Sequence, residues 1–255
     1  MLTKWQDWTN STASEVDFWN RWVSSRGLHW PEDFARRTDP AQPLPELVED
    51  QLRGAGVPEG SAVRVLDVGS GPLTMVGSAS QRYQVAVTAV DPLADEYNRI
   101  LTEGGVPVPN PAAKGFAETL DRQFDAESFD LVWCCNALDH SFDPVMGITK
   151  MLAVVKPGQP VILMFHPNEA DGGNYNGLHQ WNFDLDANGD FTIEQRGKMI
   201  NLTRLLASQV SMKAWRIDGQ NNSKSRVAVV LRRLGDFSLT QLLLSNPQGD
   251  AAASS

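Results

Sequence analysis

The middle of the chain alternates short apolar runs with stretches of helical spacing. Apolar residues are concentrated near 63–68, 85–90, 129–135 and 160–166, with a weaker run near 112–115. Short apolar runs separated by helical segments are typical of a parallel sheet covered by helices. The pattern therefore predicts an α/β fold for this part of the chain.

After His166 the pattern changes to strict alternation. In "WNFDLDANGDFTIEQ" apolar and polar residues alternate on both sides of Asn188-Gly189, a pair that favours a two-residue hairpin turn. The same stretch partly matches a calcium-binding loop, but Gln195 stands where a bidentate glutamate is required. Two later runs, "SMKAWRI" and "SRVAVVLRRL", predict a closing antiparallel pair of strands.

The first 40 residues are rich in aromatic side chains and contain five of the eight tryptophans. Thr12 and Glu15 have the spacing of a capping box, and Trp19 and Val23 have the spacing of one helical face. Two interpretations remain open for this helix. It either packs permanently on the core or acts as a lid whose aromatic face closes over a ligand.

Composition and charge narrow the class of protein. The 255 residues, 42% of them hydrophobic, suffice for one elaborated domain. A net charge of −9 without clustered Lys and Arg argues against binding to nucleic acid. No run reaches the roughly 20 apolar residues of a membrane span, and the first residues lack a signal-peptide core, so we expect a cytoplasmic protein. Cys134 and Cys135 are expected to be buried, reduced thiols.

The stretch "VRVLDVGSGPLT" breaks from a strand into a glycine turn. Gly69 and Gly71 fit the start of a dinucleotide-binding G-x-G-x-x-G motif, but Thr74 occupies the third glycine position. Asp67 precedes this turn, and its carboxylate would repel a pyrophosphate in a site of low dielectric constant. A ligand with an ammonium and a sulfonium, such as S-adenosylmethionine (SAM), would instead be attracted.

Asp91 closes the next apolar run, 24 residues beyond Asp67. A carboxylate at the end of the second strand can accept both ribose hydroxyls of an adenosine ligand. Alternatively, Asp91 caps the helix that follows.

Five segments occur in an order that resembles class I SAM-dependent methyltransferases: "VLDVGSGP", "AVDPLADEYN", "GFAETL", "FDLVWCCNALDHSFDP" and "MLAVVKPGQPVILMF". The resemblance covers about residues 60 to 166. It implies a Rossmann-like, seven-stranded, mostly parallel sheet with helices on both faces and an antiparallel strand pair at the C-terminal end. It also implies SAM as the cofactor.

The resemblance further implies a role for individual residues. Asp67 would face the methionine amino group, Asp91 would bind the ribose, and Asn136 would lie near the methionine portion. The other implied contacts are the turn Gly69, Ser70 and Gly71, then Pro92 and Leu93 on the adenine, and Ala117 and Glu118 at the adenine edge. The chain departs from the family at Leu73, where a third glycine is common, and at Phe116, where a carboxylate is common.

Three histidines fall where an active site would form, so His140, His166 and His179 are the candidate catalytic bases. His140 and His166 could equally be structural histidines. The segment "NEADGGNYNGLHQWNF" is dense in amides and aromatic groups and suits a polar acceptor. Its candidate substrate-binding residues are Glu169, Tyr175, Gln180, Trp181 and Asn182, although a solvated insertion is the alternative.

We predict a metal-free site. The metal-dependent alternative would use magnesium bound by carboxylates, and its ligands would be Asp139, Asp143, Glu169 and Asp171.

The predicted organisation is an N-terminal helical lid over 1–45 and a methyltransferase domain over 46–240. An insertion at about 167–197 would carry the substrate loop and hairpin, and 241–255 would form a flexible tail.

The predicted reaction is methyl transfer from SAM to a small polar acceptor, at a hydroxyl oxygen of a saccharide or a secondary-metabolite intermediate. Three alternatives remain: an N-methyltransferase of a small amine, a catalytically silent methyltransferase-like subunit, and a nicotinamide dehydrogenase. A homodimer is also expected.

Overall fold

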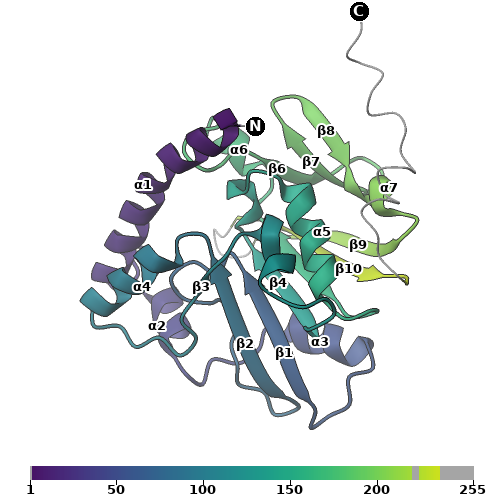
Figure 1. Ribbon diagram of the computed structural model, residues 1–255, viewed down its shortest axis with the longest axis horizontal. Coiled ribbons are helices and arrows are strands. Elements are labelled where there is room, and N and C mark those ends of the chain that lie inside the picture. The colour runs from purple at the N-terminus through teal and green to yellow at the C-terminus, as the bar shows by residue number, and fades with distance from the viewer. Residues whose placement is uncertain (1, 220–223, 236–255) are drawn as a thin grey trace, which may run out of the picture.

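The structure, a computed structural model, describes residues 2–219 and 224–235 (Figure 1). The predicted flexible tail over 241–255 and the domain boundary at residue 240 lie outside the described residues. Within the described part of the chain, no helix has both the length and the apolar character that crossing a bilayer requires.

A seven-stranded sheet forms the centre of the molecule, and its order is β3-β2-β1-β4-β5-β10-β9. Strand β10 runs antiparallel to both of its neighbours, and the pairs among β1 to β5 are parallel. The predicted α/β class, the mostly parallel sheet and the late antiparallel pair are confirmed. The strands are β1 (Ala62–Val68), β2 (Gln84–Asp91), β3 (Ala113–Lys114), β4 (Leu131–Cys135), β5 (Val161–Phe165), β9 (Val210–Ile217) and β10 (Arg226–Arg233).

Helices cover both faces of this sheet. Helix α3 (Glu46–Gly54) packs Val48 and Leu52 against one face. The opposite face is covered by α5 (Pro144–Val154) and by the 3₁₀ helix η1 (Ala117–Arg122). Because β1, β2 and β4 are parallel, their carboxyl ends meet at one edge of the sheet, where open α/β sheets bind their ligands.

Two helices precede the sheet, α1 (Leu2–Ser24) and α2 (Pro31–Thr38). Trp22 and Val23 are buried in a cluster with residues of α4 (Ala94–Glu103). The predicted capping box is wrong, because α1 begins ten residues before Thr12. The Thr12 hydroxyl donates to the Thr9 carbonyl, and Glu15 accepts a hydrogen bond from the Trp19 indole.

A second, three-stranded sheet lies beside the main one and is formed by β6 (Asn182–Leu185), β7 (Phe191–Gln195) and β8 (Lys198–Asn201). The sequence predicted its hairpin but not β8. Two short helices flank this sheet, α6 (Glu169–Gly172) and α7 (Leu202–Leu206). Stacked rings attach it to the core: Phe183 lies 4.1 Å and Phe191 5.9 Å from Phe165 of β5, between ring centroids.

The turn of the hairpin differs from the expected two-residue form. Asp186 N–H donates to the Asp190 carbonyl over 2.9 Å, so three residues form the loop. Gly189 alone in this loop has a left-handed φ, of +81°. This arrangement is typical of a turn followed by a left-handed glycine. Two acidic side chains of this segment pair with arginines, Asp184 with Arg216 and Asp190 with Arg204. Asp186 Oδ1 instead accepts from the N–H groups of Asn188 and Asp190, at 2.8 and 3.0 Å, and stabilises the turn.

Candidate active site

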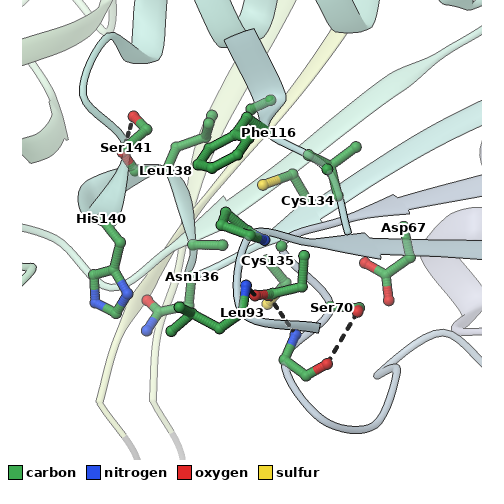
Figure 2. A pocket seen from close by; sticks show the side chains of 18 of the residues that line it. Asp67, Ser70, Leu93, Phe116, Cys134, Cys135, Asn136, Leu138, His140 and Ser141 are labelled. Atoms are coloured by element: carbon green, nitrogen blue, oxygen red, sulfur yellow. Dashed lines mark hydrogen bonds between the residues drawn. The ribbon is translucent and has the colours of Figure 1, made fainter. Parts of the chain in front are cut away.

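A cavity opens at the carboxyl edge of β1, β2 and β4, and α1 closes one side of it. Figure 2 shows Asp67 on one side of this cavity and His140 on the other, with Asn136 between them. All ten residues predicted to bind the cofactor line this cavity: Asp67, Gly69, Ser70, Gly71, Asp91, Pro92, Leu93, Ala117, Glu118 and Asn136.

The glycine turn after β1 is tightly packed against Ala137, which follows β4, and against the end of β2. Gly69 has a φ of +70°, and a Cβ there would lie 2.3 Å from the Cβ of Ala137. The N–H groups of Gly69 and Ser70 both donate to the Val90 carbonyl, at 2.8 and 3.2 Å. The turn is therefore held against the end of β2, and glycine is required at position 69.

Asp67 is buried beneath this turn, and the Thr74 hydroxyl donates to its Oδ2. Thr74, which departs from the glycine motif, thus has a defined partner. Burial raises the pKa of Asp67 to about 6, although the Thr74 hydrogen bond and the charge of Arg37 act in the opposite direction.

Asp91 accepts two backbone hydrogen bonds, from Gly71 N–H to Oδ2 at 3.0 Å and from Leu93 N–H to Oδ1 at 2.8 Å. It is not the N-cap residue of α4, because that position belongs to Leu93. Burial raises the pKa of Asp91 to about 6, against the two hydrogen bonds. Since each carboxylate oxygen has a second lone pair, Asp91 can hold the turn and still accept from a ligand.

Aromatic rings form one wall of the cavity. The ring of Phe116 lies 5.6 Å from the ring of Trp8 and 6.3 Å from that of Phe142, between centroids. Glu118 fixes this wall, because its Oε1 accepts from the N–H groups of Phe142 and Asp143, at 3.0 and 3.1 Å. Burial raises the pKa of Glu118.

Sequence reasoning did not assign the residues that α1 and α2 contribute to this cavity: Trp8, Glu15, Trp19 and Arg37. Arg37 is a buried cation in a cavity with three buried carboxylates, Asp67, Asp91 and Glu118, and burial lowers its pKa. Its Nη1 donates to the Leu73 carbonyl at 3.1 Å. No sequence motif identifies these residues, because α1 and α2, which are remote in sequence from the glycine turn, bring them to the site.

Cys134 and Cys135 also line the cavity (Figure 2), and both are free. Burial raises the pKa of Cys135 to about 11 and that of Cys134 well above its usual value. Both therefore remain protonated thiols at neutral pH, as expected from their apolar run.

A second cavity adjoins the first and includes three of the predicted substrate-binding residues, Tyr175, Gln180 and Trp181. The two cavities are neighbours because four side chains line both: Trp8, Ser141, Phe142 and Leu178.

Four other predicted residues line neither cavity: His166, Glu169, Asn182 and His179, of which His179 belongs to the cluster described in the next paragraph. His166 has its Nδ1 3.1 Å from the Ser225 carbonyl oxygen. Glu169 lies 3.8 Å from the ammonium of Lys224, and the buried Asn182 amide donates to Glu194 Oε2 at 2.6 Å. The sequence predicted His166, Glu169 and Asn182 as site residues, but in the structure each of them contacts a neighbouring segment outside the two cavities.

The other two candidate histidines meet at a buried carboxylate. His179 Nδ1 lies 2.5 Å from Asp139 Oδ2 and 3.1 Å from His140 Nε2. Burial favours a high pKa for Asp139, but the neighbouring charges of His140 and His179 outweigh it and the pKa lies below its usual value. The hydrogen bond to Asp139 raises the pKa of His179. Of these three, His140 lines the first cavity.

Residues 66–163 match the family model described as a methyltransferase domain. Among solved structures, a chain of the complex between the Haloferax volcanii Trm112 methyltransferase activator and the methyltransferase is 12% identical, with 88% of this chain and 99% of that chain covered at a TM-score of 0.50. A SAM-dependent methyltransferase from Clostridium acetobutylicum is 12% identical over 78% of this chain and 92% of that chain, at a TM-score of 0.46. A SAM-dependent methyltransferase from Mesorhizobium loti is 15% identical over 71% of this chain and 95% of that chain, at a TM-score of 0.42.

The sheet order and the helices on both faces define a Rossmann-like α/β domain. Residues 66–163 are a class I SAM-dependent methyltransferase domain, and SAM is the cofactor of this protein.

The two buried carboxyls predict how cofactor affinity changes with pH. SAM carries positive charge, and the ionised carboxylates attract it, so its affinity should fall as the pH drops through about 6. For one such group, the dissociation constant should rise about tenfold between pH 7 and pH 5. Isothermal titration calorimetry at both pH values measures this change, and circular dichroism checks the fold. An Asp67→Asn variant should show a weaker pH dependence; an affinity independent of pH would contradict the prediction.

The same shifts affect stability with a definite sign. Because their pKa values are raised to about 6, the folded protein holds these two protons more tightly than the unfolded chain does. Their contribution to stability is complete below about pH 4 and is lost as the pH rises through about 6. Because SAM is expected to bind more tightly at pH 7, the rise in melting temperature that it produces should be greater at pH 7 than at pH 5.

Proposed function

We propose that this enzyme transfers the methyl group of SAM to a hydroxyl oxygen of a small polar acceptor, such as a saccharide or a secondary-metabolite intermediate. SAM would occupy the first cavity, with its methionine ammonium towards Asp67 and its ribose at Asp91. Arg37 is placed to attract the methionine carboxylate. The acceptor would occupy the second cavity.

The observation that carries this proposal is that the two cavities adjoin beside His140, which lines the first of them. Ser141, the next residue, lines both cavities, and so does Leu178, the residue before His179. The second cavity offers amide, phenol and guanidinium groups beside an indole face, from Gln180, Tyr175, Arg196 and Trp181. Such a mixture suits an acceptor with several hydroxyls.

Methyl transfer is an in-line displacement that requires an aligned nucleophile and the exclusion of water. The acceptor oxygen forms a bond to the methyl carbon while the carbon–sulfur bond breaks. The electron pair of that bond stays on sulfur, which yields S-adenosylhomocysteine. A hydroxyl is a poor nucleophile until it loses its proton, and we assign this proton loss to the cluster of Asp139, His140 and His179.

We further propose that residues 1–45 act as a lid. The Trp8 indole N–H donates to the His140 carbonyl at 2.7 Å, and Trp8 lines both cavities. Trp19 closes the glycine turn, because a Cβ on Gly71 would lie 3.4 Å from its ring.

Release of S-adenosylhomocysteine from SAM, measured with pooled sugars, alcohols, amines and acids, tests the proposed function. We expect turnover with a hydroxyl acceptor, and we expect His140→Gln to lower it by at least about 100-fold. The affinity for SAM, measured by calorimetry, should stay within about threefold.

His29→Gln is the matched control, because His29 is exposed in the connection between α1 and α2. It should leave both turnover and SAM affinity unchanged. Turnover with amines alone, unaffected by His140→Gln, would favour N-methylation and overturn the proposal. SAM binding without turnover on any acceptor would favour a silent subunit.

A further inference from the structure

Three side-chain atoms from two distant segments converge on one point. His140 Nε2 and Asp139 Oδ2 come from η2 (Leu138–His140), and His179 Nδ1 comes from the loop before β6. The pairwise distances are 2.5 Å from His179 Nδ1 to Asp139 Oδ2, 3.1 Å from His179 Nδ1 to His140 Nε2, and 3.4 Å from His140 Nε2 to Asp139 Oδ2. Each of the three atoms therefore lies within 3.4 Å of the other two.

Hydrogen bonding alone satisfies this arrangement poorly. A carboxylate oxygen is an acceptor only, and each neutral imidazole has one nitrogen with a lone pair and one with a hydrogen. If His179 Nδ1–H donates to Asp139 Oδ2, His140 can donate its Nε2–H to the second lone pair of the same oxygen, but only over 3.4 Å and with the two N–H nitrogens 3.1 Å apart. If His140 Nε2–H donates to His179, the His179 lone pair faces the carboxylate at 2.5 Å. One central cation would satisfy all three atoms together.

The distances are close to those around a metal ion. Zinc binds nitrogen at about 2.0–2.1 Å and oxygen at about 2.0–2.2 Å, so tetrahedral ligand atoms lie about 3.3 Å apart. Two of the three separations here are 3.1 and 3.4 Å. The third must widen by under about 1 Å, which a rotation of the half-exposed His179 ring can supply.

Backbone contacts hold the three groups in place. The Asp139 carbonyl accepts from the N–H of Gln180, which ties the loop carrying His179 to η2 at 3.0 Å. The Trp8 indole donates to the His140 carbonyl. Asp139 Oδ1 is buried and has no hydrogen-bond partner among the described residues, so a second oxygen of the same carboxylate remains available at this point.

The donor set distinguishes this site from the carboxylate site for magnesium considered in the sequence. Asp143 instead caps α5, where its Oδ1 accepts from Met146 N–H at 2.9 Å. Two imidazoles and one carboxylate favour a divalent transition metal over magnesium. Three protein ligands also leave a coordination position open, as in catalytic zinc sites.

We propose that Asp139, His140 and His179 bind one divalent transition-metal ion, of which zinc is the representative, with its open position towards the acceptor. This inference rests on the proposed function for the role of the ion: with the ion bound, the three side chains would act as its ligands rather than as bases, and the ion would bind the acceptor hydroxyl, lower its pKa and so release its proton to solvent. The position fits that role, since His140 lines the cofactor cavity and its neighbour Ser141 lines both cavities.

Metal binding by the full-length protein tests the proposal without reference to activity. The protein is treated with a chelator, dialysed against Zn²⁺, and analysed by inductively coupled plasma mass spectrometry. We expect about one zinc per chain, and a loss of affinity of at least about 100-fold in His179→Ala and in His140→Ala. His29→Ala, which removes an exposed histidine, should bind zinc as the unmodified chain does. Co²⁺ should give visible absorption bands typical of nitrogen and oxygen ligands, and the two cluster variants should lose them.

Absence of stoichiometric zinc and cobalt binding would overturn the proposal, as would equal binding by the cluster variants. His179→Ala is the informative variant if Asp139 variants fail to fold, because His179 is the most exposed of the three. Metal binding and methyl transfer are measured separately, so the two proposals can fail independently. Protein that binds no metal but methylates a hydroxyl at an unchanged rate would refute the metal site alone. Protein that binds the metal but shows no turnover would refute the proposed function alone.

Discussion

Replacing Asp91 with alanine is expected to weaken SAM binding by about 100-fold. Two ribose hydroxyls would each lose a hydrogen bond to a charged acceptor, and such bonds contribute about 1.5–3 kcal/mol each. A total loss of about 3 kcal/mol corresponds to a factor of about 100 in the dissociation constant. Isothermal titration calorimetry measures the change, and circular dichroism and thermal melting show whether the fold survives.

Asp95→Ala is the control for this substitution. Asp95 also lies at the start of α4, but its side chain is exposed and pairs with Lys114, so its removal should leave SAM affinity unchanged. Asp91→Asn keeps one acceptor oxygen and should give an intermediate loss. An Asp91→Ala protein that is folded and binds SAM within threefold of the unmodified affinity would exclude Asp91 from the ribose site.

The second large effect is expected from Gly69→Ala. A left-handed residue other than glycine costs about 1–2 kcal/mol, and crowding in a packed interior adds about 1–3 kcal/mol. Because the added Cβ would overlap Ala137, we expect the free energy of unfolding to fall by about 2–5 kcal/mol. The displaced turn should also weaken SAM binding by at least about tenfold.

Gly105→Ala separates the two causes. Gly105 has a φ of +62° but nothing within 4 Å of its Cβ position, so it carries the conformational penalty without the overlap. Urea denaturation should therefore show a loss of about 1–2 kcal/mol for Gly105→Ala and unchanged SAM affinity. Equal losses for the two variants would mean that the contact with Ala137 is not limiting.

The central strands could be predicted from the sequence because buried parallel strands are near-continuous apolar runs, as "VRVLDV" and "DLVWCC" are apart from one or two polar residues. Local details were predicted less well. Thr12 and Glu15 fit a capping motif, yet α1 continues through them, since the buried face that includes Trp22 stabilises one long helix. The hairpin turn holds one residue more than predicted, because only Gly189 adopts the left-handed conformation.

The residues that line the site also fall into two groups, those that the sequence predicted and those that it did not. The place of Asp67 and Asp91 at the cavity could be predicted because both lie at the ends of strands whose carboxyl termini share one edge of the sheet. Arg37 and Trp8 could not, because tertiary packing alone brings α1 and α2 to that edge. The contact between His140 and His179 spans 39 residues, and no local spacing rule relates positions so far apart.

The Trp8 indole touches the rims of both cavities and is fastened to the backbone of His140. If residues 1–45 act as the proposed lid, cofactor retention and acceptor shielding would both depend on this side chain. A displacement of α1 would then admit water to both cavities together, and its return would exclude water from both before methyl transfer.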